Sequence, residues 1–129
     1  MFVTMIRALK LTLIAAAVAA FALPTSAAAQ GGFTVDGGLA KQGEKLWKSR
    51  GCSGCHVIGK KAGGPDVVGV VNRRGVDWVR RWLKNTTEML ETDETAMALL
   101  AEWNNTKMPQ IKLSDSEIEA LIHYMASAK

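Results

Sequence analysis

Two cysteines and a histidine occur within five consecutive residues, Cys52-Ser53-Gly54-Cys55-His56. The chain has no other cysteine, and its second histidine, His123, lies near the end of the sequence. Thiols and an imidazole at this spacing can form a redox disulfide, part of a zinc site, or the attachment point of a covalent haem.

Haem attachment fits this motif best, because C-x-x-C-H is the signature of c-type haem. Two thiols three positions apart can bond to two vinyl groups on one porphyrin edge, and the adjacent His56 then reaches the iron. A redox C-x-x-C pair usually lies between a strand and a helix, and no strand pattern precedes Cys52. A zinc site would need His123 as its fourth ligand. A chance match stays open, since only three of the five positions are fixed.

Haem iron has a second axial position, and Met108 is the predicted ligand there. Asn104-Asn105-Thr106 precede it and Pro109 follows it, so it falls in a loop between two helices, and the proline stiffens that loop. His123 is the rival, but it lies inside a helical pattern. Three other methionines also lie in helical patterns, where the side chain is usually core filler: Met89, Met97 and Met125. Ligation by His and Met is typical of electron carriers and favours the ferrous state.

Apolar residues recur with helical spacing in four stretches, and no stretch alternates well enough for a strand. The clearest helix follows the capping-box pattern Ser114-Asp115-Ser116-Glu117. The other predicted helices are Gly38–Arg50, which ends at Gly51, Asp77–Lys84 and Asp93–Trp103. The glycine-rich stretch Gly59–Asn72 is predicted to be a loop. The sequence therefore predicts an all-α domain with long loops.

The first 29 residues have the three parts of an export signal. Arg7 and Lys10 give a basic start, an uncharged apolar run follows over 11–23, and Ala27-Ala28-Ala29 fits the small-residue cleavage rule. The apolar run is short for a membrane anchor, since a spanning helix needs about 20 residues. We therefore predict a cleaved signal peptide at 1–29, a domain at 30–129, and a soluble protein in the periplasm.

Length and charge limit the remaining possibilities. With 129 residues, 48% hydrophobic and 22% charged, the chain has the size of one globular domain. Of its 16 basic residues, Arg7 and Lys10 leave with the predicted signal while all 12 acidic residues remain, so the formal net charge falls from +4 to +2. That charge is too small to indicate nucleic-acid binding. No basic residue lies between Lys84 and Lys107, a stretch with five acidic residues: Glu88, Glu91, Asp93, Glu94 and Glu102.

Together these features resemble a class I mono-haem cytochrome c over essentially all of Gly38–Lys129. The parts come in the family's order: a helix, the C-x-x-C-H motif, a Gly-Pro loop, short helices, a Met-Pro pair and a C-terminal helix. The resemblance implies the class I cytochrome c fold, in which the N- and C-terminal helices cross and all helices pack around one covalent haem c. Gly43 and Trp47 would cross the last helix at Leu121 and Tyr124.

The resemblance also assigns residues around the haem. The Pro65 carbonyl would accept a hydrogen bond from the motif histidine and so orient its ring. Arg73 or its neighbour Arg74 would neutralise one haem propionate. Trp82 or Trp78 would donate its indole N–H to the other propionate. Core packing is the alternative role for these side chains, and the sequence does not choose between the neighbours.

A periplasmic one-electron carrier of a respiratory chain, rather than an enzyme, is the leading function. Two alternatives stay open: a tightly bound electron-transfer subunit of a periplasmic dehydrogenase or reductase, and a haem enzyme or gas sensor with an open sixth site. The carrier would be a monomer that binds no nucleic acid. It would meet its redox partners, a donor dehydrogenase and an acceptor oxidase or reductase, at the exposed haem edge. Four lysines would ring that edge and favour an acidic partner: Lys60, Lys61, Lys107 and Lys112.

Overall fold

Helices joined by loops make up the part of the chain that the computed structural model describes, residues 32–129. These residues contain no strand, which confirms the all-α prediction. In chain order the elements are α1 (Gly37–Ser49), the 3-10 turn η1 (Cys52–Gly54), α2 (Val70–Arg74), α3 (Val76–Lys84), α4 (Thr86–Thr92), α5 (Glu94–Glu102) and α6 (Asp115–Ser127). The predicted signal peptide at 1–29 lies outside the described residues. Among the helices that are described, none is long and apolar enough to cross a membrane.

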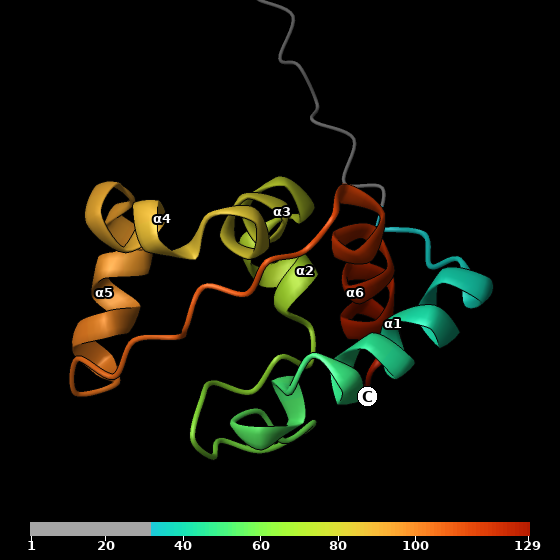
Figure 1. The fold of residues 1–129 in the computed structure, drawn as a ribbon, viewed down its shortest axis with the longest axis horizontal. Helices are drawn as coiled ribbons and strands as arrows, with labels where there is room; N and C mark the ends of the chain where they lie inside the picture. Colours follow the sequence, from blue (N-terminus) through green and yellow to red (C-terminus); the bar gives the residue numbers. More distant parts are fainter. Residues whose placement is uncertain (1–31) are drawn as a thin grey trace, which may run out of the picture. The chain divides into compact units, whose positions relative to one another are not determined.

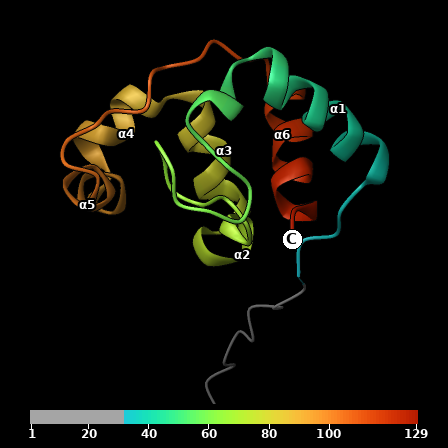
Figure 2. The ribbon, with the colours of Figure 1, turned by 90° about the horizontal axis from the view of Figure 1, so that it is seen from below.

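Helices α1 and α6 cross at close range (Figure 1, Figure 2). Gly43 makes this approach possible, because a Cβ atom there would overlap the carbonyl oxygen of Ala120 and lie 2.7 Å from Tyr124 Cβ. Beside the crossing, the ring centroids of Trp47 and Tyr124 lie 5.6 Å apart. The predicted crossing of the first and last helices is thus confirmed, although Ala120 rather than Leu121 faces the glycine.

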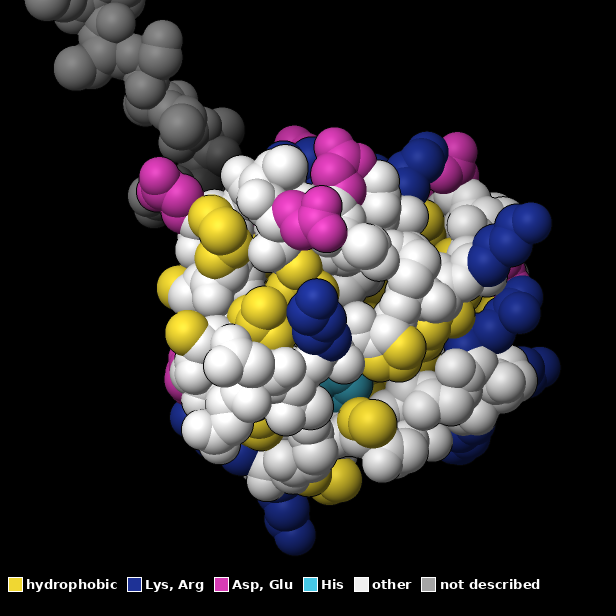
Figure 3. All heavy atoms as spheres, turned by 60° about the vertical axis from the view of Figure 1, so that its left-hand side comes forward, with side chains coloured by type: hydrophobic (Ala, Val, Ile, Leu, Met, Phe, Trp, Pro, Cys, Tyr) yellow, Lys and Arg dark blue, Asp and Glu magenta, His cyan; other side chains and the backbone are white. Residues whose placement is uncertain are grey.

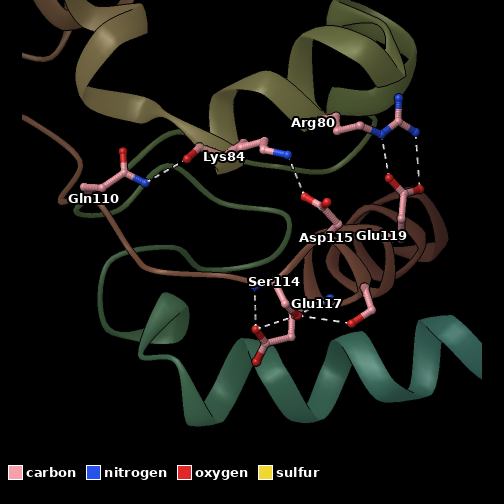
Figure 4. Close-up of polar contacts among 8 residues, drawn as sticks. Arg80, Lys84, Gln110, Ser114, Asp115, Glu117 and Glu119 are labelled. Carbon is pink, nitrogen blue, oxygen red and sulfur yellow. Dashed lines mark hydrogen bonds and ion pairs between the residues drawn. The ribbon is translucent and has the colours of Figure 1, made fainter.

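A capping box fixes the start of α6, as the sequence predicts (Figure 4). The Ser114 backbone N–H donates to the Glu117 carboxylate at 2.8 Å, and the Ser114 hydroxyl accepts from the Glu117 N–H at 3.3 Å. Arg50, at the end of α1, donates to the same carboxylate. The Ser114 N–H first, and then the Arg50 guanidinium, lower the pKa of Glu117 to about 2, so this carboxylate stays charged to lower pH than an ordinary glutamate does.

Residues 106–114, between α5 and α6, contain no helix and are named the strap here. Asn104 and Asn105 turn the chain into it with φ angles of 52° and 58°, a left-handed conformation that asparagine tolerates better than most residues. The strap then runs from α5 back past α3 to α6 (Figure 1). The Gln110 amide anchors it by donating to the carbonyl oxygen of Lys84, at the end of α3, at 3.3 Å.

Ion pairs join α3 to α6 beside this anchor (Figure 4). Arg80 Nε lies 2.5 Å from Glu119 Oε1, and Lys84 Nζ lies 2.8 Å from Asp115 Oδ1. Each pair is partly or largely exposed, so each contributes little free energy of folding by itself. Their effect is to set the orientation of α3 against α6, which matters because α3 carries two tryptophans that the site uses.

Two short helices depart from the sequence prediction, whereas α1, α3 and α5 begin and end within one residue of it and α6 begins within one residue of it. Helix α2 begins at Val70, so the predicted loop Gly59–Asn72 is wrong over its last three residues. Helix α4 has no counterpart among the predicted helices, because Thr86 and Thr87 are β-branched and weaken the helical signal at its start. Asn85 compensates by accepting the Glu88 N–H at 3.4 Å as an N-cap.

Gly43→Ala is expected to destabilise the folded protein by about 1–3 kcal/mol, because the added methyl group must push α1 away from α6. Thermal unfolding followed by circular dichroism measures the change. Gly37→Ala in the first turn of the same helix is the control, since a Cβ atom there meets nothing within 4 Å. Equal unfolding midpoints for the two variants would contradict the role given to Gly43.

Candidate haem site

An apolar pocket opens inside the domain, and much of its wall is the core itself. Six of the nine residues in the buried core cluster also line the pocket: Trp47, Val67, Val79, Leu83, Leu121 and Met125. Helix α5 adds Leu99 and Leu100 to the lining, and Trp103 follows at its end. On one face of the molecule, hydrophobic side chains follow the walls of a hollow (Figure 3). Walls of this kind suit a large apolar ligand held by a few polar groups.

The C-x-x-C-H motif brings three reactive side chains to this pocket. Cys52, Cys55 and His56 all line it. The tight turn at η1 gathers them, because the Cys52 carbonyl accepts the backbone N–H groups of Cys55 at 3.2 Å and His56 at 3.0 Å. Both thiols are free. Burial raises the pKa of the Cys52 thiol.

The ring of His56 is oriented by Gly64 and Pro65. Its Nδ1 lies 2.8 Å from the Pro65 carbonyl oxygen. A carbonyl oxygen can only accept, so Nδ1 carries the proton and Nε2 keeps a lone pair for a metal. Gly64 leaves room for the ring, since a Cβ atom there would lie 2.5 Å from Cε1 and 2.8 Å from Nδ1. The predicted hydrogen bond between His56 and Pro65 is therefore present, and ligation of iron by His56 stays a prediction.

The strap carries Met108 to the same pocket, where its side chain is half-buried. Trp82 of α3 donates its indole N–H to Met108 Sδ at 3.3 Å. Trp82 also stacks on Trp78, with centroids 5.4 Å apart and planes 9° apart. The Trp78 N–H donates to Asp93 at 3.1 Å and lowers the pKa of that carboxyl. Both indole N–H groups thus have partners within the protein, and the propionate role of Trp82 or Trp78 stays a prediction.

Arg73 and Arg74 both line the pocket but are held in different ways. Arg73 donates to the carbonyl oxygens of Val68 and Asp66, the latter at 3.1 Å. Arg74 places its guanidinium 5.7 Å from the centroid of the Trp78 ring. Both side chains are exposed, so they add positive charge at the edge of the pocket. Which of the two neutralises a propionate stays a prediction.

Two residues weighed in the sequence analysis lie away from the pocket. His123 accepts the Asp36 backbone N–H at 2.9 Å, and its ring lies 4.7 Å from that of Phe33, so it has the packing role expected of it. It is therefore not beside the cysteines, where a zinc site would need it. The expectation that Met97 fills the core is wrong, because it is 41% exposed. Helix α5 turns its two leucines and Trp103 toward the pocket instead.

These groups fit a c-type haem part by part. The thiols of one turn match the vinyl groups, the imidazole and the thioether match the iron, the apolar walls match the porphyrin faces, and the two arginines match the propionates. An all-α domain with such a pocket is a haem protein of the c type.

Comparisons with known proteins agree. The sequence matches the family described as Cytochrome c over residues 40–129. Cytochrome c from Rhodothermus marinus is similar in structure, with a TM-score of 0.67 and 29% identity, covering 73% of this chain and 79% of that one. An engineered form of it, bound to a carbene intermediate, has a TM-score of 0.64 and 28% identity, and the match covers 73% of this chain and 80% of that one. The cytochrome c domain of the pp3183 protein from Pseudomonas putida has a TM-score of 0.59 and 40% identity, and the match covers 64% of this chain and 83% of that one. No curated protein matches.

The chain therefore belongs to the cytochrome c family. It is an electron-transfer haem protein with the all-α class I fold, and its haem is covalent, with Cys52 and Cys55 in the attachment motif.

Gly64→Ala is expected to break the hydrogen bond between His56 and Pro65, because the new methyl group would displace the imidazole. The measurement is the Nδ1–H signal of His56 in the ¹⁵N NMR spectrum of the diamagnetic ferrous protein, which should exchange with water faster or disappear. Gly63→Ala is the matched control, since a Cβ atom there lies no closer than 3.4 Å to Cys55. A protected signal in both variants would show that Gly64 does not set the ring position.

Proposed function

We propose that this cytochrome is an exported, diffusible one-electron carrier whose haem iron is ligated by His56 and Met108. One observation carries the proposal: two side chains that line the same pocket each have a fixed hydrogen-bond partner. His56 Nδ1 is tied to the Pro65 carbonyl at 2.8 Å, and Met108 Sδ accepts from Trp82 at 3.3 Å. The first contact leaves Nε2 available, and the second leaves a sulfur lone pair available.

This ligand pair accounts for the reaction and for what the site excludes. When bound, the haem supplies an iron that cycles between the ferric and ferrous states. His56 contributes a nitrogen whose basicity is raised by the Pro65 carbonyl, and Met108 contributes a neutral sulfur that favours the ferrous state. With both axial positions taken by protein, no substrate reaches the iron. The protein then works by electron transfer through the pocket edge.

Export rests on the sequence of residues 1–29, whose basic start, apolar run and alanine triplet have the order of a cleaved signal. A c-type cytochrome released from such a signal would work in the periplasm, between a donor dehydrogenase and an acceptor oxidase or reductase. The acidic stretch between Lys84 and Lys107 departs from the basic mitochondrial carriers, so their partners are not assigned to this chain.

Met108→Ala is expected to abolish the weak far-red absorption band that reports sulfur bound to ferric haem iron, and to lower the reduction potential. The measurement is the ferric spectrum and redox titration of the haem-loaded protein. Met97→Ala is the matched control, because Met97 is 41% exposed and is not among the residues that line the pocket. A wild-type protein without the band, or a Met108→Ala variant that keeps it, would rule out Met108 as the ligand.

Docking is proposed at the pocket edge, where the predicted lysines differ in availability. Lys107 lines the pocket. Lys61 Nζ lies 3.5 Å from Glu102 Oε1, and both side chains are more than half exposed, so this ion pair is weak. The negative charge of Glu102 nevertheless offsets the positive charge of Lys61. Lys60, Lys61 and Lys112 are not among the residues that line the pocket, so the positive edge rests on Lys107, Arg73 and Arg74. A partner with an acidic patch would dock there weakly and quickly.

Lys107→Glu is expected to slow oxidation of the ferrous protein by hexacyanoferrate(III), an anionic oxidant, several-fold at low ionic strength. Stopped-flow rates over a range of salt measure this, and the difference from wild type should shrink as salt rises. Lys45→Glu on α1 is the control, since it makes the same change in net charge away from the pocket. Equal slowing by both variants would assign the effect to net charge and not to a docking edge.

A further inference from the structure

The Met108 sulfur accepts a hydrogen bond from a side chain whose own position is fixed. Trp82 Nε1 lies 3.3 Å from Met108 Sδ, within the range of a hydrogen bond to sulfur. The two residues come from different elements, α3 and the strap, so the contact joins a rigid helix to a segment with no helical hydrogen bonds of its own. An N–H aimed at a thioether occupies one of its two lone pairs and leaves the other free.

Stacking holds one face of the Trp82 indole, and a hydrogen bond fixes the backbone of the same residue. Its ring lies nearly parallel to Trp78, with planes 9° apart. Trp78 is held in turn by its N–H donation to Asp93, the N-cap residue of α5 that also accepts the Ala96 N–H at 3.0 Å. The Thr86 hydroxyl, 1% exposed, donates to the Trp82 carbonyl at 2.7 Å. The indole N–H is thus presented to the sulfur by a network that spans α3, α4 and α5.

We propose that Trp82 is a positioning residue that holds the Met108 sulfur for the iron and raises the reduction potential of the haem. This inference rests on the proposed ligation by Met108. The positive end of the indole N–H dipole points at the sulfur, so it would act on an iron held by that sulfur. It disfavours the ferric state, which carries one more positive charge than the ferrous state. Hydrogen bonds to axial ligands are one of the ways in which proteins set haem potentials. The same N–H cannot also serve a propionate, so the two assignments are exclusive.

The test compares Trp82→Phe with Trp78→Phe in the haem-loaded protein. Each variant keeps an aromatic ring for the stack and removes one indole N–H, but only the first removes the donor to sulfur. In Trp82→Phe the equilibrium constant for reduction should fall by roughly two- to tenfold, the range of one hydrogen bond. The far-red band should move to longer wavelength, because the sulfur lone pair rises in energy. Trp78→Phe keeps the donor to sulfur, so the band should stay where it is and the equilibrium constant should fall by less than it does in Trp82→Phe.

The pH profile of the potential separates the sulfur from a propionate. A thioether does not titrate, so the fall in Trp82→Phe should be the same at every pH. A fall that changes with pH, together with an unmoved band, would overturn the proposal and assign the N–H to a propionate. An unchanged potential with an intact band would also overturn it, while leaving Met108 as the ligand. Absence of the band in the wild type would instead remove the ligation, and this inference with it.

A measurement on the wild type covers the case in which the variant does not fold. In the ferrous protein, which is diamagnetic, the Nε1–H of Trp82 should show a nuclear Overhauser contact with the methyl group of Met108. The Trp78 Nε1–H, which faces Asp93, should show none and serves as the internal control. Absence of the contact from Trp82 would overturn the proposal.

Discussion

The residues that would fill the core of this domain are largely the residues that line its pocket. Trp47, Leu83 and Leu121 belong to both. A domain of about 100 residues buries a limited fraction of its surface and has little core to spare. Its interior is therefore complete only when a large apolar group fills the pocket, and helices as far apart in sequence as α1 and α6 pack around that group. Covalent attachment suits this architecture, because a group around which the core packs must not dissociate.

The elements around the pocket divide into a rigid frame of helices and a segment, the strap, that this frame holds in place. On the rigid side, the α1–α6 crossing at Gly43 and the ion pairs between α3 and α6 define a frame. On the other, the strap has no helix and is held by side chains: Gln110 and Trp82 bond it to α3, and Met108 and Leu113 pack against the core. The sulfur of Met108 is thus located by groups on α3 rather than by its own backbone. This division explains why the short stretch after α5 can lack helix and still present a side chain at a defined place.

Sequence reasoning predicts those parts of the fold that short patterns control. The capping box at Ser114 depends on neighbouring residues alone, and it is present as expected. The outcomes that differ depend on tertiary contacts. Helix α4 starts with two threonines, whose propensity is poor, and forms because Asn85 caps it and Thr86 is buried. Met97 is exposed because of the way α5 is rotated about its own axis. The spacing of the apolar residues in this helix does not fix that rotation to better than one residue.

The site shows the same division. The hydrogen bond from His56 to Pro65 is implied by the family resemblance that the motif and the Gly-Pro pair carry. The role of Gly64, which leaves space for the imidazole, and the contact from Trp82 to sulfur both need three-dimensional proximity. Trp82 and Met108 are 26 residues apart, and no periodic signal links them.

The two sides of the pocket, the C-x-x-C-H turn and the strap, also differ in how firmly they are attached. The cysteines and His56 share one turn, and the covalent bonds keep that turn on the haem, whereas the strap is tied down by a handful of side chains. Local opening begins where backbone hydrogen bonds are fewest. Were the strap to lift, the Met108 side of the pocket would open while Cys52 and Cys55 kept the cofactor attached.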